Sequence, residues 1–297
     1  MRFFHLSDLH IGKQLHHYNL KEDQRHILGE IIDYARDIHP DAIVIAGDVY
    51  DKSIPSAEAV TIFDDFLTDL AAVTPTIPVL IISGNHDSAE RLQYASGFLK
   101  KHQIYVAGNA PAVPEDYLQK VVLSDEHGAV NFYLLPFIKP SYVRNVSETV
   151  PESYTEAVDM LLQREKINYS ERNVLVSHQF FTKGNETPET CESERISVGG
   201  IDNVDISVIQ KFDYAALGHI HKAQRVGEEH IRYCGTMLKY SVSEADHTKS
   251  LIMVEIGEKG MEPVITALPL HPLRDVKKKK GQLHEVMEHA SESDRQD

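Results

Sequence analysis

The sequence predicts a layered α/β protein, and three observations support this fold class. Short apolar runs rich in β-branched residues alternate with segments of helical periodicity through most of the chain, which is the pattern of β-α-β units. The 297 residues, 42% of them hydrophobic, are enough to bury one large core. After residue 223 the pattern changes to short alternating segments with glycine-containing turns, which predicts antiparallel strands.

The first third of the chain is expected to form three buried strands and two helices. Apolar runs typical of buried strands lie at residues 2–7, 41–47 and 78–84. Apolar residues at helical spacing predict helices over residues 19–38 and 59–70. Asn19, followed three residues later by Glu22, resembles a capping box that would begin the first helix. These elements would form one half of a layered fold.

Further strands continue the sheet. They are expected at residues 119–123, 130–135, 173–177 and 213–217, with a helix near 152–167 between them. Asp87 and Glu90 fit the first and fourth positions of an N-terminal cap, which predicts a helix after the third strand and gives Asp87 a mainly structural role. Residues 180–200 form the long polar insertion.

Composition excludes several classes of protein. The formal net charge of −15 argues against a protein that coats nucleic acid with a broad basic surface, although bound metal cations can bring a polyanion to an acidic chain. Cys191 and Cys234 lack the spacing of a zinc knuckle or a disulfide framework. No apolar run reaches the roughly 18 residues of a membrane span, and the N-terminal segment lacks the layout of a secretory signal. We therefore expect a cytoplasmic protein.

Residue types that bind metals follow five of the predicted strands. The strand ends carry, in chain order, Asp8 and His10, then Asp48, then Asn85 with His86 and Asp87, then His178, then His219 and His221. Each motif alone is more often structural than functional. The carboxyl ends of parallel strands share one edge of a sheet, however, and ligands bind at that edge. The ordered set therefore predicts one site.

The residue types fit a pair of divalent ions. Two ions about 3.5 to 4 Å apart need a bridging carboxylate, for which Asp48 is the natural candidate, with neutral ligands around it. The alternating pairs Asp8-x-His10 and His219-x-His221 can turn both side chains to the same side of an extended segment. Two anionic ligands under-neutralise two divalent cations, so the site would attract phosphate.

Together these motifs resemble the calcineurin-like metallophosphoesterase superfamily. The segments DLHIGK, AGDVYDKSIPS, GNHDSAERL, LGHIHKAQ, RYCGTMLKYSVSEADHTKSLIMVEI and PLRDV, spread over residues 1 to 276, resemble its SbcD-type nuclease branch. The resemblance implies an αββα sandwich with mixed sheets. It also implies a nuclease domain over residues 1–270 and the start of a C-terminal capping region over residues 271–297, in a truncated chain or a short family member.

The resemblance also implies the roles of the site residues. One metal would be held by Asp8, His10, Asp48 and His221, and the other by Asp48, Asn85, His178 and His219. His86 would stabilise the phosphate or protonate the leaving oxygen, although a structural role is the alternative. Asp51 would help to position the phosphate or simply cap a turn. Manganese is the expected metal, with magnesium, iron and zinc chemically conceivable.

The implied function is a metal-dependent DNA nuclease of a double-strand-break processing complex, acting on duplex ends as an exonuclease and on single strands as an endonuclease. Its implied partners are DNA, an SbcC-type coiled-coil ATPase and a second copy of the chain. The two copies would form a homodimer through the helices near 56–71 and 88–101. Apolar residues there could equally all belong to the core. The alternatives are a phosphoesterase for small substrates such as cyclic nucleotides and a non-catalytic interaction module. The sequence alone does not give strand polarity, end preference or ATP dependence.

Overall fold

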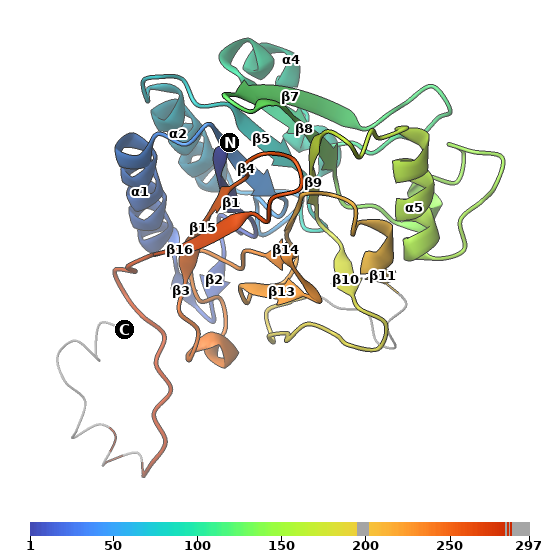
Figure 1. Cartoon of the computed structure of the whole chain (residues 1–297). Coiled ribbons are helices and arrows are strands. Elements are labelled where there is room, and N and C mark those ends of the chain that lie inside the picture. The colour runs from blue at the N-terminus through green and yellow to red at the C-terminus, as the bar shows by residue number, and fades with distance from the viewer. Residues whose placement is uncertain (195–201, 283, 285, 287–297) are drawn as a thin grey trace.

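Two six-stranded mixed sheets packed face to face form the centre of the molecule (Figure 1). The computed structural model describes residues 1–194, 202–282, 284 and 286. The first sheet has the order β16-β15-β1-β4-β5-β6 and the second has the order β13-β14-β12-β9-β8-β7. Helices cover the outer face of each sheet, so the predicted αββα sandwich is confirmed.

The first sheet carries the N-terminal strands. Its members are β1 (Arg2–Leu6), β4 (Ala42–Ala46), β5 (Val79–Ile82), β6 (Ile104–Ala107), β15 (Ser250–Glu255) and β16 (Val264–Pro269). The strands β1, β4, β5 and β6 run parallel, whereas β15 pairs antiparallel with both β1 and β16. The carboxyl ends of β1, β4 and β5 therefore reach the same edge.

The second sheet also combines parallel and antiparallel strands. Its members are β7 (Gln119–Asp125), β8 (Gly128–Leu135), β9 (Arg172–Ser177), β12 (Tyr214–Leu217), β13 (Gln224–Val226) and β14 (Glu228–Tyr233). Four central strands are parallel, and the edge strands β7 and β13 pair antiparallel with their neighbours. Short pairs form between β2 (Gln14–Leu15) and β3 (Tyr18–Asn19), and between β10 (Phe180–Thr182) and β11 (Asn203–Asp205).

Alternation along the central strands explains why apolar residues occupy both of their faces. Successive side chains point to opposite faces of a strand. In β1, Phe3 packs into the core between the two sheets, whereas Phe4 packs into the core between the first sheet and its helices. In β9, Val174 faces the inter-sheet core and Leu175 faces the outer layer of the second sheet. Both faces are buried, so no polar face remains.

The helices cover the outer faces of both sheets. The first sheet is covered by α1 (Lys21–Ile38) and α2 (Ala57–Ala71), and α5 (Tyr154–Arg164) covers part of the second (Figure 1). Two of these helices have a serine cap, because Ser56 and Ser153 accept hydrogen bonds from main-chain N–H groups three residues later. The expected capping box at Asn19 is wrong: Leu20 is the N-cap of α1, and the Asn19 side chain instead accepts from the Lys21 N–H.

Three other expectations are corrected. The helix expected after Asp87 is broken into α3 (Ala89–Leu92) and α4 (Ser96–Leu99), because Ala95 adopts a left-handed conformation with φ of 60°. Ser88, and not Asp87, caps α3. The chain after residue 223 is not wholly antiparallel, since β14 runs parallel to β12. Residues 195–201 of the polar insertion lie outside the described part.

After β16 the described chain leaves the sandwich and contains no regular element between residues 270 and 282 (Figure 1). Arg274 in this segment pairs with the buried carboxylate of Asp23 on α1. Within the described residues, no helix has the length and apolar character needed to span a bilayer.

Candidate metal centre

The seven residues expected to bind metal come together where strands of both sheets end. Asp8 and His10 follow β1, Asp48 follows β4 and Asn85 follows β5, all from the first sheet. His178 follows β9, and His219 and His221 follow β12, from the second sheet. Apart from Asn85, which is half-buried, all of these side chains are buried. The two sheets therefore supply ligand-type groups to one place.

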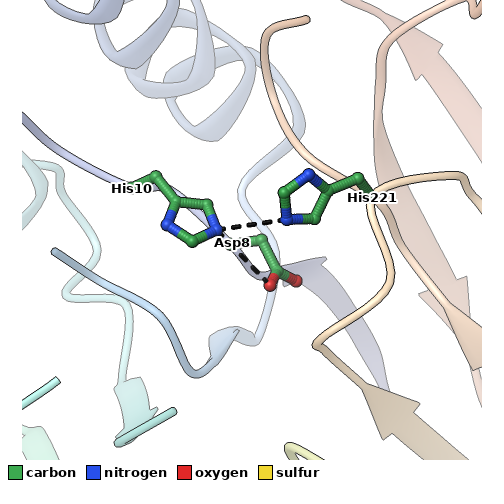
Figure 2. A group of neighbouring side chains, drawn as sticks. All are labelled: Asp8, His10 and His221. Atoms are coloured by element: carbon green, nitrogen blue, oxygen red, sulfur yellow. Dashed lines mark hydrogen bonds and ion pairs between the residues drawn. The ribbon is translucent and has the colours of Figure 1, made fainter. Parts of the chain in front are cut away.

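Asp8, His10 and His221 form the first group (Figure 2). The Nε2 atoms of His10 and His221 lie 3.2 Å apart, and His10 Nε2 lies 3.9 Å from Asp8 Oδ1. The two rings come from opposite sheets and point toward one another with the carboxylate beside them. Three ligand atoms this close, two of them imidazole nitrogens, fit a divalent cation.

A second group lies beside the first and contains Asp8, Asp48 and His178. His178 Nε2 is 3.4 Å from Asp48 Oδ2 and 4.0 Å from Asp8 Oδ1. Asn85 Oδ1 lies 3.1 Å from His178 Nε2 and 2.9 Å from His219 Nδ1. These nitrogens and oxygens converge as a mixed neutral and anionic ligand set.

Asp48 belongs to the second group and also lies close to His10 of the first. Its Oδ2 atom is 3.4 Å from His178 Nε2 and 3.7 Å from His10 Nε2, so the same carboxylate oxygen is near an imidazole of each group. Its other oxygen accepts a 2.8 Å hydrogen bond from the main-chain N–H of His86. This position is the one expected of a bridging carboxylate between two ions.

The backbone at the site is held in an uncommon conformation. Four of the ligand-type residues have positive φ angles: Asp8 at 51°, His10 at 43°, Asp48 at 50° and His219 at 98°. A residue with a Cβ adopts this region only when the surrounding structure enforces it. The strand ends thus turn sharply, and this turn directs the side chains across the edge of the sandwich.

Glycines beside the ligands allow the loops to approach closely. A Cβ added at Gly84 would lie 2.1 Å from Asp48 Oδ1, and a Cβ at Gly218 would lie 2.0 Å from the carbonyl oxygen of Ala46. At Gly47 a Cβ would lie 2.4 Å from His178 Nδ1. These three glycines directly precede Asp48, Asn85 and His219 in the sequence, so any larger residue would push the ligand loops apart.

Hydrogen bonds fix which ring nitrogen faces the centre. His178 Nδ1 donates to the carbonyl oxygen of Ala46 at 2.7 Å, which leaves its Nε2 lone pair directed inward. Ser193 Oγ donates to Glu244 Oε1, so His221 Nδ1 must donate to Ser193 Oγ, at 2.8 Å. Both imidazoles therefore present an unprotonated Nε2 when neutral, as a metal ligand must.

Burial and the two aspartates control protonation at the site. Burial lowers the pKa of His219 to about 3 and that of His10 well below its ordinary value, so both rings are neutral. Burial opposes a charge on His178 as well, but Asp48 and Asp8 raise its pKa to about 9. Burial alone would raise the pKa of Asp48, yet His178 and its neighbours hold it well below the usual range. The carboxylates of Asp8 and Asp48 thus stabilise a positively charged group that lies beside both of them.

His86 lies beside the seven ligand-type residues and forms a further close group with His10 and Asp51. Its Nδ1–H donates to the carbonyl oxygen of Asp51 at 2.8 Å, and its ring centroid is 4.8 Å from that of His10. The Asp51 carboxylate pairs with Lys13 at 2.9 Å and lies 3.8 Å from His10 Nδ1. The main chain of Asp51 therefore orients His86, and its side chain lies at the edge of the ligand group.

A buried polar network behind His221 was not found by sequence reasoning. Glu244 pairs with Lys249 at 2.6 Å, and Lys249 Nζ also donates to the carbonyl oxygen of His221 at 3.0 Å. Glu194 accepts from the main-chain N–H of His221 at 2.7 Å. His221 is thus held at its N–H, its carbonyl and, through Ser193, its ring. The stretch SVSEADHTKS contains Glu244 and Lys249, but its spacing gives no sign of this contact.

Asp87 connects two loops instead of capping a helix. Its carboxylate accepts hydrogen bonds from the main-chain N–H groups of Val49, Tyr50 and Gly84. Burial, with the charge of Asp48 as a smaller contribution, raises its pKa to about 7. It therefore joins the loop after β4 to the loop after β5 and fixes the separation of Asp48 and Asn85.

Comparison with known proteins adds three findings. Residues 1–223 match the family model for calcineurin-like phosphoesterases. The SbcD subunit of nuclease SbcCD from Staphylococcus epidermidis is 32% identical over 292 residues, which cover 97% of this chain and 74% of that protein. Among solved structures, GAP50, the anchor in the inner membrane complex of Plasmodium, aligns over 94% of this chain and 90% of that chain. Its TM-score is 0.50 and its identity is 14%, so this likeness concerns the fold alone.

Proposed function

The chain belongs to the calcineurin-like phosphoesterase family, and we propose that it is a metal-dependent DNA nuclease that acts as an exonuclease on duplex ends and as an endonuclease on single strands. The observation that carries the proposal is the convergence of six ligand-type side chains from both sheets around Asp48. The likeness to the SbcD subunit of nuclease SbcCD directs this phosphoesterase site toward DNA.

Each group of residues has a task in this proposal. Asp8, His10, Asp48 and His221 would hold one divalent ion, and Asp48, Asn85, His178 and His219 would hold the second. Two ions bound there would activate a water molecule and polarise the phosphodiester. Asp48 belongs to both sets, and the hydrogen bonds at His178 and His221 keep the nitrogen lone pairs directed toward the place where the ions would be held.

His86 is the proposed acid-base or charge-stabilising residue. Its Nδ1–H is already used by the Asp51 carbonyl, so its Nε2 is the atom that would meet the phosphate or the leaving oxygen. Asp51 is then a positioning residue, because it acts on the substrate through His86 and through its contact with Lys13.

The ligand set favours manganese among the divalent metals. It combines four imidazoles with two carboxylates and one amide oxygen, and Mn²⁺ accepts this mixture of nitrogen and oxygen ligands. We infer that the described C-terminal segment after residue 270 begins a capping region, because it leaves the sandwich after β16. An SbcC-type coiled-coil ATPase is the proposed partner, in a cytoplasmic complex that processes double-strand breaks.

A homodimer is the proposed assembly. Most apolar residues of α2 are buried in the core, but Val60 on this helix is 45% exposed. Tyr94 and Phe98, in the broken helix that follows β5, are 82% and 63% exposed. These side chains lie on the two segments expected to contact a second copy, and their burial there would explain their exposure in a single chain.

The test is cleavage of end-labelled duplex and single-stranded DNA with manganese, comparing the wild type with Asp48→Ala. Bis-p-nitrophenyl phosphate serves as a small phosphodiester, and Asp69→Ala, an exposed residue of α2, as the matched control. We expect the wild type and Asp69→Ala to cut DNA and Asp48→Ala to lose at least about a thousandfold in rate.

The other outcomes discriminate between functions. Hydrolysis of the small ester and of cyclic nucleotides with intact DNA, also after addition of the ATPase partner, would replace the nuclease by a small-substrate phosphoesterase. Failure to hydrolyse any phosphodiester would indicate an interaction module.

A further inference from the structure

A cavity of about 820 Å³ opens directly beside the candidate metal centre. Asn85 and His219 form its inner wall. Its other walls come from the loops that follow β4, β5, β6 and β8, from Asp202 just before β11, and from the beginning of α5. The volume is in the range of sites that bind small molecules or single substrate groups, roughly 300 to 1,000 Å³. Any substrate atom held at the metal centre would have this cavity as its neighbour.

Aromatic side chains form one wall of this cavity. Phe137 lies next to the metal centre, with its ring centroid 6.5 Å from that of His178. Tyr142 is 52% exposed, and Tyr154 is half-buried at the first turn of α5. The short helix that contains Tyr142, Pro140–Tyr142, packs against α5, so the two tyrosines belong to adjoining elements. We call these three residues the aromatic wall.

A cation and neutral polar groups complete the lining. Lys139 Nζ lies 6.0 Å from the ring centroid of Tyr142, so a positive charge accompanies an exposed aromatic face. Asn109 and Ser88 add amide and hydroxyl groups. The carboxylates of Glu90 and Asp202 also line the cavity. They disfavour a run of phosphates inside it, but they can accept hydrogen bonds from the amino groups of nucleobases.

The ligand that combines these features is a single unpaired nucleotide. A nucleobase has a flat face that stacks on aromatic rings whatever its sequence, and the phosphate attached to it pairs with a lysine. We propose that the aromatic wall binds the base of the unpaired nucleotide next to the scissile phosphate, with Lys139 contacting the backbone. The inference deepens the proposed nuclease function and rests on it.

This arrangement has a consequence for the substrate. A base inside a duplex stacks on its neighbours, and removing it from the stack requires a few kcal/mol, least at a frayed end or in a single strand. Stacking of the base on the aromatic wall offsets part of this energy. The cavity therefore selects single strands, frayed ends and overhangs over internal positions of a duplex.

The test uses single-stranded oligonucleotides in which one abasic residue is placed at successive positions. For the wild type, an abasic residue beside a given phosphodiester is expected to lower cleavage there by about 5- to 100-fold, the range of base–aromatic stacking. Tyr142→Ala is expected to lower cleavage of the intact strand by a similar factor, mainly through KM, and to lose the response to the abasic residue. Tyr142→Phe, which keeps the ring, should retain both. Tyr117→Ala, an exposed tyrosine outside the cavity, is the matched control.

A binding measurement separates this inference from the nuclease function. In the His86→Ala background with manganese, quenching of a 2-aminopurine base in a single strand should be strong and should be lost with Tyr142→Ala. Quenching without DNA cleavage by the wild type would retain the nucleotide site and reject the nuclease. Two results would overturn the inference. One is a wild-type cleavage rate that is unchanged by the abasic residue, and the other is a Tyr142→Ala variant whose cleavage rate falls by the same factor on intact and abasic strands.

Discussion

The main-chain N–H of His86 donates a 2.8 Å hydrogen bond to Oδ1 of Asp48. The residue proposed to act on the leaving group is thus attached through its backbone to the carboxylate proposed to bridge the metals. The ring of His86 contributes nothing to this bond. Ring and backbone can therefore be separated experimentally.

His86→Ala should abolish most of the nuclease activity while both metals remain bound. The backbone bond to Asp48 persists in the variant, whereas the imidazole that would face the phosphate is removed. General acid-base groups contribute about 10²- to 10⁴-fold, and we expect a loss of kcat in this range. The measurements are DNA cleavage rates and metal content by plasma mass spectrometry. His102→Ala, an exposed histidine, is the control; loss of metal in His86→Ala would make His86 a ligand instead.

Glu244→Ala should weaken the metal site that contains His221. Without the Glu244 carboxylate, Ser193 and Lys249 lose their shared partner, and the ring and carbonyl of His221 lose the groups that orient them. Partners of this kind change metal affinity by about 10- to 100-fold. Calorimetric titration with Mn²⁺ should show one weakened site and one unchanged site.

Two further variants test whether orientation is the cause. Ser193→Thr keeps the hydroxyl and should bind metal as the wild type does, whereas Ser193→Ala should resemble Glu244→Ala. If both metal sites weaken equally in Glu244→Ala, the network supports the fold in general and not His221.

Gly218→Ala should damage both stability and metal binding. Its Cβ would lie 2.0 Å from the Ala46 carbonyl oxygen and 2.6 Å from His178 Nδ1, so main chain must move at the junction of the two sheets. We expect a loss of about 2 to 3 kcal/mol in the free energy of unfolding. Gly29 on α1 is the matched control, because no atom lies within 4 Å of an added Cβ there. Gly29→Ala should stabilise by about 0.5 to 1 kcal/mol. Urea unfolding measures both, and equal effects would contradict the close approach.

Asp125→Asn should destabilise the protein at neutral pH, and the destabilisation should become smaller as the pH falls below about 4. Asp125 accepts two hydrogen bonds from the buried guanidinium of Arg172, at 2.9 and 2.5 Å, and this pairing lowers the pKa of Asp125. The variant leaves the buried guanidinium of Arg172 without its anionic partner, which costs about 3 kcal/mol.

The pH dependence follows from the direction of that shift. As the pH falls, the Asp125 carboxyl of the unfolded chain takes up a proton near the ordinary pKa of an aspartate, about 3.9. In the folded protein the same carboxyl takes up its proton only at a lower pH. The stabilisation is therefore complete above about pH 5 and declines below about pH 4. The difference between wild type and Asp125→Asn in urea unfolding at pH 7 and pH 3.5 measures it, and a constant difference would contradict the prediction.

The convergence of the ligand-type residues could be predicted because strand direction in a parallel sheet is constrained. Asp8 and Asp48 both follow buried parallel strands, so their neighbourhood follows from topology and needs no knowledge of side-chain packing. The same reasoning places His178 and His219 at the edge of the second sheet. The single sheet expected from the strand ends was wrong, because these strands belong to two sheets. The sandwich implied by the family resemblance brings the edges of the two sheets together.

The remaining features depend on contacts that local patterns do not encode. Ser193 reaches Glu244 across 51 positions, from loops without periodicity. Alternating polarity identified strands after residue 223 but carries no information on direction, so the parallel pairing of β14 with β12 was missed. The helix after Asp87 is interrupted at Ala95, where apolar spacing alone predicted continuity.

Residues from the strand ends of both sheets surround Asp48, so a ligand bound there contacts both sheets and affects how firmly they are held together. Arg172, at the start of β9, donates to the Gly257 carbonyl just after β15 and so fastens the sandwich at the far edge. Ions bound by residues of both sheets at the opposite edge would link the two sheets a second time. Metal binding would then raise the melting temperature in a concentration-dependent way. Chelation would weaken the contact between the sheets at the metal centre and leave the contact between Arg172 and Gly257 in place.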